Sequence, residues 1–61
     1  MARVWTVRLK HHIKDGLEPG FTVTVTTQQN VKNWPSLEQK LMDMSYGTIG
    51  GCATDTFWDW Y

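Results

Sequence analysis

The first fourteen residues constrain the fold most, because their side chains alternate between two kinds. From residue 5 to residue 13, apolar residues and one histidine occupy the odd positions, while polar and basic residues occupy the even positions. Successive side chains of a β-strand point to opposite faces. The alternation therefore predicts a strand over residues 3–13 with one buried face. The buried side would carry Trp5, Val7, Leu9, His11 and Ile13, and the outer side Val4, Thr6, Arg8, Lys10, His12 and Lys14.

A second alternating run follows a turn that contains two glycines. Residues 21–27 place Phe21, Val23 and Val25 on one side and threonines on the other. Pro19 and Gly20 suit the central positions of a type II turn, which needs a positive φ at the second of them. Two strands joined by a short turn-rich loop predict an antiparallel hairpin.

The next segment predicts one helix that runs to about residue 46. Its apolar residues follow a helical spacing and form one stripe. The stripe consists of Trp34, Leu37, Leu41 and Met44. Two starts are compatible with the sequence: Pro35 as the first helical residue, or a capping box between Ser36 and Gln39. Gly47 is expected to end the helix.

Residues 54–61 are rich in strand formers and predict a third strand, but they allow two registers. One face would carry Thr54, Thr56, Trp58 and Trp60, and the other Asp55, Phe57, Asp59 and Tyr61. The tryptophan face is expected to be buried, because carboxylates without partners are costly to bury. The two aspartates would then lie across from Arg8 and Lys10, where opposite charges stabilise a sheet.

The predicted fold class is α+β, a three-stranded sheet with one helix packed on one face. The order strand–strand–helix–strand makes the helix a crossover connection. Placing the last strand beside the first gives sheet order 2-1-3, and the charge complement favours this order. The last strand is then parallel to the second and antiparallel to the first. With 61 residues, the chain is expected to form one small domain, 1–61.

Cysteine content and hydropathy predict a cytoplasmic protein. Cys52 is the only cysteine, so the chain cannot form an internal disulfide. This favours a reducing compartment. The sequence has no apolar run of the roughly 18 residues that a membrane span needs, and no signal-peptide pattern at its start.

No enzymatic, metal or cofactor site is expected. His11 and His12 would point to opposite faces of a strand, and Cys52 has no neighbouring base to activate it. Asp55 and Asp59 would lie roughly 13 Å apart along a strand, too far to act as paired carboxylates. The glycines after the helix do not lead into another helix, as a phosphate-binding loop requires.

The formal net charge is zero, but the charges are unevenly placed. Four of the six basic residues precede every acidic one, and the last nineteen residues contain three aspartates and no base. Either the two ends pair within the fold, or the basic end binds an anionic partner. Pairing within the fold is favoured, because a neutral chain has little long-range attraction for nucleic acid.

We hypothesise a protein-binding module that either forms a homodimer or inhibits or adjusts a larger complex. Aromatic side chains beside arginine are typical of interface hot spots. The candidate contact residues on the outer sheet face are Val4, Arg8, Lys10, Phe57, Asp59 and Tyr61. The uncharged edge of the second strand is a second route to association. The alternative is a nucleic-acid-binding face on which aromatic rings stack bases, although the aspartates oppose it.

The sequence resembles a family of small uncharacterised bacterial proteins that are often carried on mobile elements. The resemblance rests on the segments Val7-Arg8-Leu9-Lys10, Leu17-Glu18-Pro19-Gly20 and Val23-Thr24-Val25, and more loosely on residues 37–47. It implies the same order of two strands, a helix and a third strand. The aromatic C-terminal residues 57–61 depart from the family pattern. The family supplies no activity, and only a role against a host protein complex follows from the resemblance.

Overall fold

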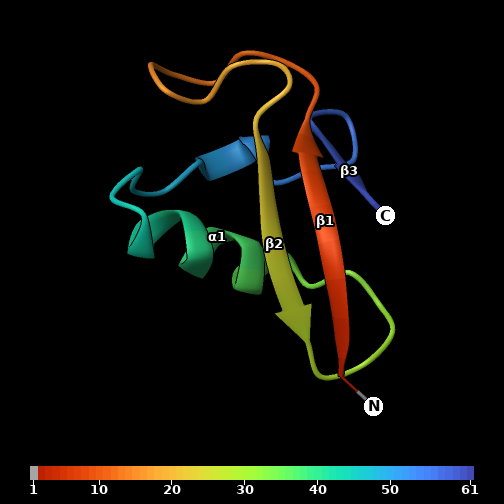
Figure 1. The fold of residues 1–61 in the computed structure, drawn as a ribbon. Helices are drawn as coiled ribbons and strands as arrows, with labels where there is room; N and C mark the ends of the chain where they lie inside the picture. The colour runs from red at the N-terminus through yellow and green to blue at the C-terminus, as the bar shows by residue number, and fades with distance from the viewer. Residues whose placement is uncertain (1) are drawn as a thin grey trace.

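The alternating first strand is the centre of the sheet (Figure 1). A computed structural model describes residues 2–61 of the chain. Its elements are β1 (Arg3–Leu9), β2 (Thr22–Thr27), α1 (Trp34–Asp43), the short 3-10 helix η1 (Gly50–Cys52) and β3 (Trp58–Trp60). The strand order is β2-β1-β3, and β1 is antiparallel to both neighbours. The predicted α+β class, sheet order and strand directions are therefore confirmed.

The register of the sheet buries one set of alternating side chains on each strand. In β1 and β2, Val7 lies opposite Val23 and Trp5 opposite Val25. In β1 and β3, Val7 lies opposite Trp60, and backbone bonds between Thr6 and Tyr61 (2.6 and 2.9 Å) extend the ladder. The predicted inward orientation of Trp58 and Trp60 is confirmed, because both are buried.

One hydrophobic core joins the sheet to α1. The predicted core residues Trp5, Leu9, Val23, Leu37 and Leu41 are all buried in it, and Phe21 packs at its margin. The rings of Trp5 and Trp34 stand edge-to-face against the ring of Trp60, with centroids 5.5 and 5.3 Å away. Leu17 and Ile49 are also buried, although the sequence did not suggest either as a core residue. Both come from connecting segments, where no periodic pattern marks a buried position.

The first strand is shorter than predicted, because the β1–β2 ladder closes at Leu9. Leu9 N–H donates to the Phe21 carbonyl (2.8 Å), and Gly20 N–H donates to the Leu9 carbonyl (2.9 Å). Residues 11–13 then leave the sheet, and His11 is exposed rather than on the inner face. The predicted turn is supported: Gly20 has φ +96°, and Phe21 N–H donates to the Glu18 carbonyl.

Helix α1 begins at Trp34, one residue before the predicted start at Pro35 and before the Ser36 capping box, and it ends before Tyr46. Asn33 caps its N-terminus, because the Asn33 side-chain oxygen accepts from Ser36 N–H (3.1 Å). Ser36 is therefore inside the helix, and the capping-box alternative was wrong. At the C-terminus, Tyr46 N–H donates to the Leu41 carbonyl and Ser45 N–H to the Met42 carbonyl. These are the two bonds of a Schellman motif, and its left-handed residue is Ser45 (φ +69°) rather than a glycine.

The third strand is also shorter than predicted. Residues 54–57 form a turn in which Phe57 and Trp58 N–H both donate to the Thr54 carbonyl (3.1 Å each). Lys10 N–H donates to the Phe57 carbonyl (2.7 Å), and this is the last bond between the two segments. Beyond Lys10 the first segment has left the sheet, so residues before Phe57 have no strand to pair with.

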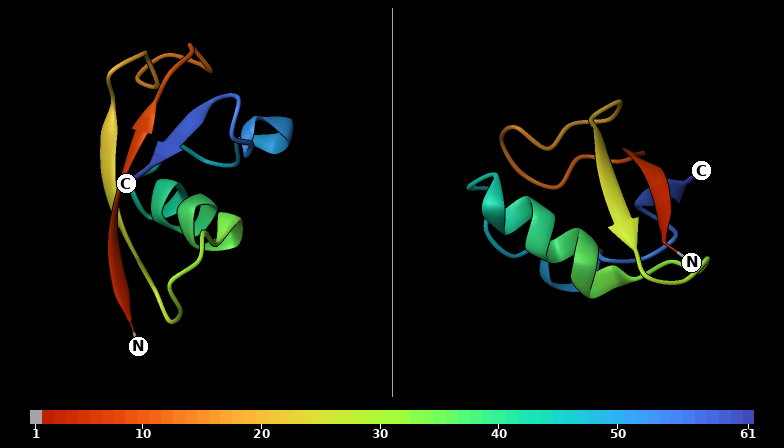
Figure 2. Two further views of the ribbon diagram at one scale, coloured as in Figure 1. Left: turned by 90° about the vertical axis from the view of Figure 1, so that its right-hand side faces the viewer. Right: turned by 60° about the horizontal axis from the view of Figure 1, so that its bottom comes forward.

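The helices cover one face of the sheet and leave the other open. Figure 2 shows α1 and η1 on the same side of the strands. Among the strands, the α1 backbone lies closest to β2, and the Trp34 ring at the start of α1 also contacts Trp60 of β3. In the part of the chain that the structure describes, neither helix has the length and apolar character needed to cross a bilayer.

We expect Ser45→Gly to stabilise the protein. A left-handed conformation costs a side-chain-bearing residue about 1–2 kcal/mol, and part of this gain is offset by the greater chain entropy of unfolded glycine. The net increase in the free energy of unfolding should be about 0.5–1 kcal/mol, measured by urea denaturation. The matched change Ser36→Gly, inside α1, should lower stability by about 0.5 kcal/mol. A loss of stability in Ser45→Gly would contradict this account of the helix end.

We expect Trp58→Phe to cost more than Trp60→Phe, although both remove the same atoms. Trp58 Nε1 donates to the Cys52 carbonyl (2.9 Å), whereas Trp60 Nε1 is buried without a hydrogen-bond partner among residues 2–61. Trp58→Phe therefore leaves a carbonyl unpaired, and the difference in unfolding free energy should be about 1–3 kcal/mol. Equal losses in urea denaturation would show that the Trp58 bond contributes nothing.

Candidate functional site

The uncovered face of the sheet carries most of the predicted contact residues. We call it the open face. It consists of Val4, Thr6 and Arg8 of β1, Thr22, Thr24 and Thr26 of β2, and Asp59 and Tyr61 at β3. Each strand contributes alternate side chains, and the intervening ones are those of the core. The open face is therefore fixed by the same register that buries the tryptophans.

The apolar part of the open face is formed by Val4 and Tyr61. Their exposed fractions are 65% and 59%. Tyr61 exchanges both backbone bonds with Thr6, which is two residues from Val4. Val4 and Tyr61 are thus diagonal neighbours across two strands, a relation that places side chains about 7–8 Å apart. Together they form a small apolar patch on a rigid backbone.

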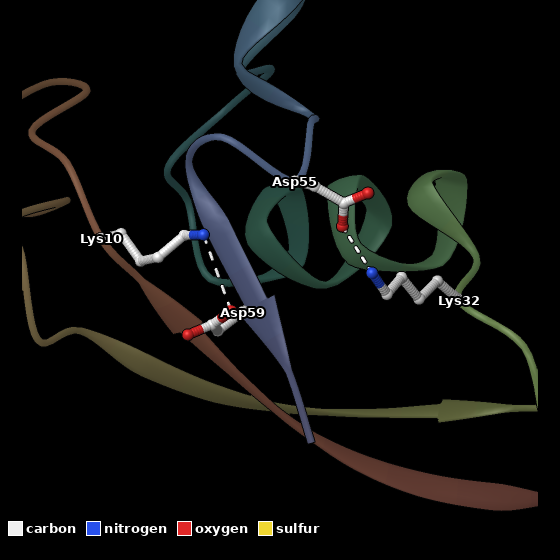
Figure 3. Close-up of polar contacts among 4 residues, drawn as sticks. All are labelled: Lys10, Lys32, Asp55 and Asp59. Atoms are coloured by element: carbon white, nitrogen blue, oxygen red, sulfur yellow. Dashed lines mark hydrogen bonds and ion pairs between the residues drawn. The ribbon is translucent and has the colours of Figure 1, made fainter.

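Lys10 and Asp59 form the ion pair that the sequence suggested between the two ends of the chain. Arg8 lies directly opposite Asp59 in the register. The Asp59 carboxylate is nevertheless 3.6 Å from Lys10 Nζ (Figure 3). Both side chains are partly exposed, so the pair contributes little stability. Its main effect is to occupy Asp59 and place Lys10 at the margin of the open face.

Asp55 does not face the basic strand as predicted. It lies in the turn before β3 and pairs with Lys32 Nζ at 2.5 Å (Figure 3). The reason is that the third strand begins only at Trp58, so the alternation of side chains does not extend back to Asp55. The open face therefore carries one carboxylate, that of Asp59, rather than two.

Phe57 was predicted on the outer face, and the structure corrects this position. It precedes β3, is partly buried and packs against the core. Its ring centroid lies 5.8 Å from that of His11, in an edge-to-face arrangement. The strand pattern that put Phe57 beside Tyr61 does not apply here, because residue 57 is in a turn.

Arg8 differs from the other basic residues near the N-terminus. Arg3 stacks over the Trp5 ring (3.7 Å to the centroid) and donates to the Asn30 side chain. Lys10 pairs with Asp59, and Lys14 Nζ donates to the Tyr46 and Thr48 carbonyls (2.6 and 3.2 Å). No ion pair or side-chain hydrogen bond of Arg8 occurs among residues 2–61. Its guanidinium is the free cation of the open face.

A second surface lies along the outer edge of β2, beside α1. Two hollows of about 400 and 320 Å³ follow this edge. The first is lined by Thr6, Thr22, Val23, Thr24, Lys40 and Met44, and the second by Thr24, Val25, Thr26, Ser36, Gln39, Lys40 and Asp43. The sequence indicated the free edge of β2 but not that side chains of α1 contribute to this surface. Met44 was expected in the core, and its exposure (42%) at the edge is a correction.

Residues 2–61 contain no group of three or more histidine, cysteine, aspartate or glutamate side chains placed to hold a metal ion. The two histidines have separate partners: His11 faces Phe57, and His12 Nδ1 lies 2.8 Å from Glu18. Cys52 is a free, partly buried thiol. The surfaces with contact chemistry are therefore the open face and the β2 edge.

Comparisons of the chain with protein-family models, with curated proteins and with solved structures gave no match. The resemblance to mobile-element proteins stays a prediction.

We expect Phe57→Ala to destabilise the protein and Tyr61→Ala to leave its stability nearly unchanged. Phe57 packs against the core, so its truncation should lower the free energy of unfolding by about 1–3 kcal/mol. Tyr61 is mostly exposed and keeps its backbone bonds as alanine, so its loss should stay below about 0.5 kcal/mol. Urea denaturation followed by tryptophan fluorescence measures both. The reverse ranking would place Phe57 on the surface and Tyr61 in the core.

Proposed function

We propose that this chain is a non-enzymatic protein-binding module that contacts its partner through the open face. The observation that carries the proposal is the exposed Val4–Tyr61 pair beside Arg8, whose charge is not used within the fold. Tyrosine and arginine are over-represented among residues that dominate binding energy. Here both are held on a hydrogen-bonded sheet, so little backbone entropy is lost on association.

The partner surface follows from this chemistry. An apolar group would cover Val4 and Tyr61, and a carboxylate would meet the Arg8 guanidinium, with which it can form a bidentate pair. The threonines of β2 add hydroxyl groups at the margin. A second copy of the chain would have to bring Asp59 to Arg8, and Asp59 is already paired with Lys10. The proposal therefore favours a different protein over a homodimer.

Nucleic acid is the weaker candidate. A sheet that binds single strands uses several aromatic rings as stacking platforms, and with Phe57 turned to the core, Tyr61 is the aromatic residue of the open face. Asp59 lies opposite Arg8 and repels phosphate. Arg3, Lys10 and Lys14 are engaged within the fold.

A biological role is suggested by the resemblance. A small mobile-element protein of this kind would act in the cytoplasm by inhibiting or adjusting a host protein complex. The free thiol of Cys52 is compatible with a reducing compartment. Binding to one surface of a larger protein, without chemistry of its own, would be sufficient for such a role.

We expect the double variant Val4→Thr with Tyr61→Ser to lose partner binding while remaining folded. Affinity capture from the source organism would identify a candidate, and titration of that purified candidate provides the measurement. The dissociation constant should rise at least about tenfold, because the variant removes the apolar anchor. Val31→Thr is the matched control, since Val31 is as exposed as Tyr61 (59% each) but lies in the loop after β2.

Circular dichroism of the variant should match that of the parent protein. Light scattering tests self-association, and a labelled single-stranded oligonucleotide tests the alternative. Unchanged affinity in the double variant would remove the open face from the interaction. Tight oligonucleotide binding that is lost with Tyr61→Ser would replace the protein partner with nucleic acid.

A further inference from the structure

The outer edge of β2 presents a row of unpaired backbone groups. Leu9 N–H bonds to Phe21, so residues of the same parity in β2, Val23 and Val25, direct their backbone groups toward β1. The N–H and C=O groups of Thr22, Thr24 and Thr26 therefore point away from the sheet. Among residues 2–61, none of them forms a backbone bond with another segment.

Nothing in the sequence of β2 protects this edge from another strand. Natural edge strands are usually protected by lysine, proline, a bulge or a covering segment. β2 has the sequence TVTVTT, which contains no charge and no proline. All of its residues are good strand formers. The edge is therefore suited to strand addition, in which backbone bonds supply affinity and side-chain pockets supply specificity.

Helix α1 lies behind this edge and projects beyond it, and we call the surface formed by Lys40, Asp43 and Met44 the ledge. Figure 1 shows α1 passing behind β2, with its C-terminal half extending beyond the strand on the side away from β1, and the right-hand view of Figure 2 agrees. Lys40 lines both hollows along the edge, with Met44 on the Thr22 side and Asp43 on the Thr26 side. A strand added beside β2 would thus lie across α1 and contact these three side chains.

The ledge leaves room for one strand but not for a second copy paired along the full edge. Symmetric antiparallel pairing of β2 with β2 places both copies of α1 on the same face of the joined sheet. Paired strands are about 4.8 Å apart, whereas packed helices need about 8–10 Å between their axes. Because α1 starts behind β2 and projects outward beyond it (Figure 1), two copies would overlap there. The occupant is therefore a strand without its own helix on that face.

The charges of the ledge specify the side chains of this strand. Lys40 has no ion pair among residues 2–61, and the Asp43 carboxylate receives one bond from the Gln39 amide (3.0 Å), which leaves its second oxygen available. Two alternate residues of an added strand face α1, one opposite Val23 and one opposite Val25. The first meets Lys40 and Met44, and the second meets Asp43, with Lys40 between the two positions.

We propose that the β2 edge binds an extended, antiparallel segment of a partner protein with the pattern basic–any–acidic, read from its N-terminus. The acidic residue lies opposite Val23 and pairs with Lys40, and the basic residue lies opposite Val25 and pairs with Asp43. The intervening residue pairs with Thr24 through its backbone. This inference rests on the proposed protein-binding function and names the segment that the partner would add to the sheet.

The test uses a cyclised hairpin peptide whose free edge presents Thr-Lys-Thr-Glu-Thr, because a preformed strand binds without the cost of ordering. Its control is the same hairpin with lysine and glutamate exchanged, which has identical composition and charge. Nitrogen-15 amide shifts of the intact chain report binding. The first hairpin should perturb Thr22, Thr24 and Thr26 and bind about tenfold more tightly than the control, which corresponds to two reversed ion pairs at a surface.

Two further variants, one of the hairpin and one of the chain, test the inference more specifically. N-methylation of the central threonine of the hairpin removes one backbone bond and should weaken binding at least about fivefold. The charge-reversed chain, Lys40→Glu with Asp43→Lys, should prefer the exchanged hairpin. Equal affinity for the two hairpins, preference for the exchanged one by the parent chain, or shifts confined to Arg8 and Tyr61 would each overturn the inference.

These outcomes are distinguishable from a failure of the proposed function. If the hairpins do not bind, while partner affinity still depends on Val4 and Tyr61, the edge assignment falls and the open face stands. A chain that dimerises through β2, seen as a doubled mass that the hairpin does not compete away, would likewise overturn it in favour of a second copy.

Discussion

Every strand pair in this protein includes β1, so the fold depends on the backbone of one seven-residue strand. Its odd residues bond to β2 and its even residues to β3, as the bonds of Leu9 and Thr6 show. The same alternation sends Trp5, Val7 and Leu9 into the core and leaves Val4 and Arg8 outside. A one-residue slip in either ladder would therefore change both which residues bond to the neighbouring strand and which side chains are buried.

The sequence was sufficient to predict the structure where an alternating pattern could be combined with the free-energy cost of burying charged groups. The inward tryptophans followed from alternation and from the penalty for burying Asp55 and Asp59, and the sheet order followed from the complementary charges of the first and last strands. What it could not give were the ends of the elements. Ser45 takes the left-handed position although Gly47 is two residues away, because the helix bonds close at Leu41 and Met42. Propensity alone does not reveal where the last bond forms.

The candidate site was predictable to the extent that it lies on regular strands. Val4, Arg8, Asp59 and Tyr61 were placed on one face by parity, and the register puts them there. Phe57 was misplaced because the strand begins one residue after it. The ledge beside β2 was missed for another reason. Its position depends on how α1 crosses the sheet, and a helical stripe shows which residues are buried but not which strand they cover.

The dimensions of the sheet connect the two surfaces. The sheet is three strands wide and its longest strand has seven residues, so it spans at most about 14 Å by 23 Å, or roughly 300 Å² before side-chain relief. A standard interface takes about 800 Å² from each partner. The open face alone is therefore suited to a weak, transient contact. A strand added at the outer edge of β2 would widen the sheet. It would also place the rest of the partner beside Thr22, Thr24 and Thr26 of the open face. Val4 and Tyr61 would then act as anchors for a partner already held by backbone bonds, and the two surfaces together would bury more area than the open face alone.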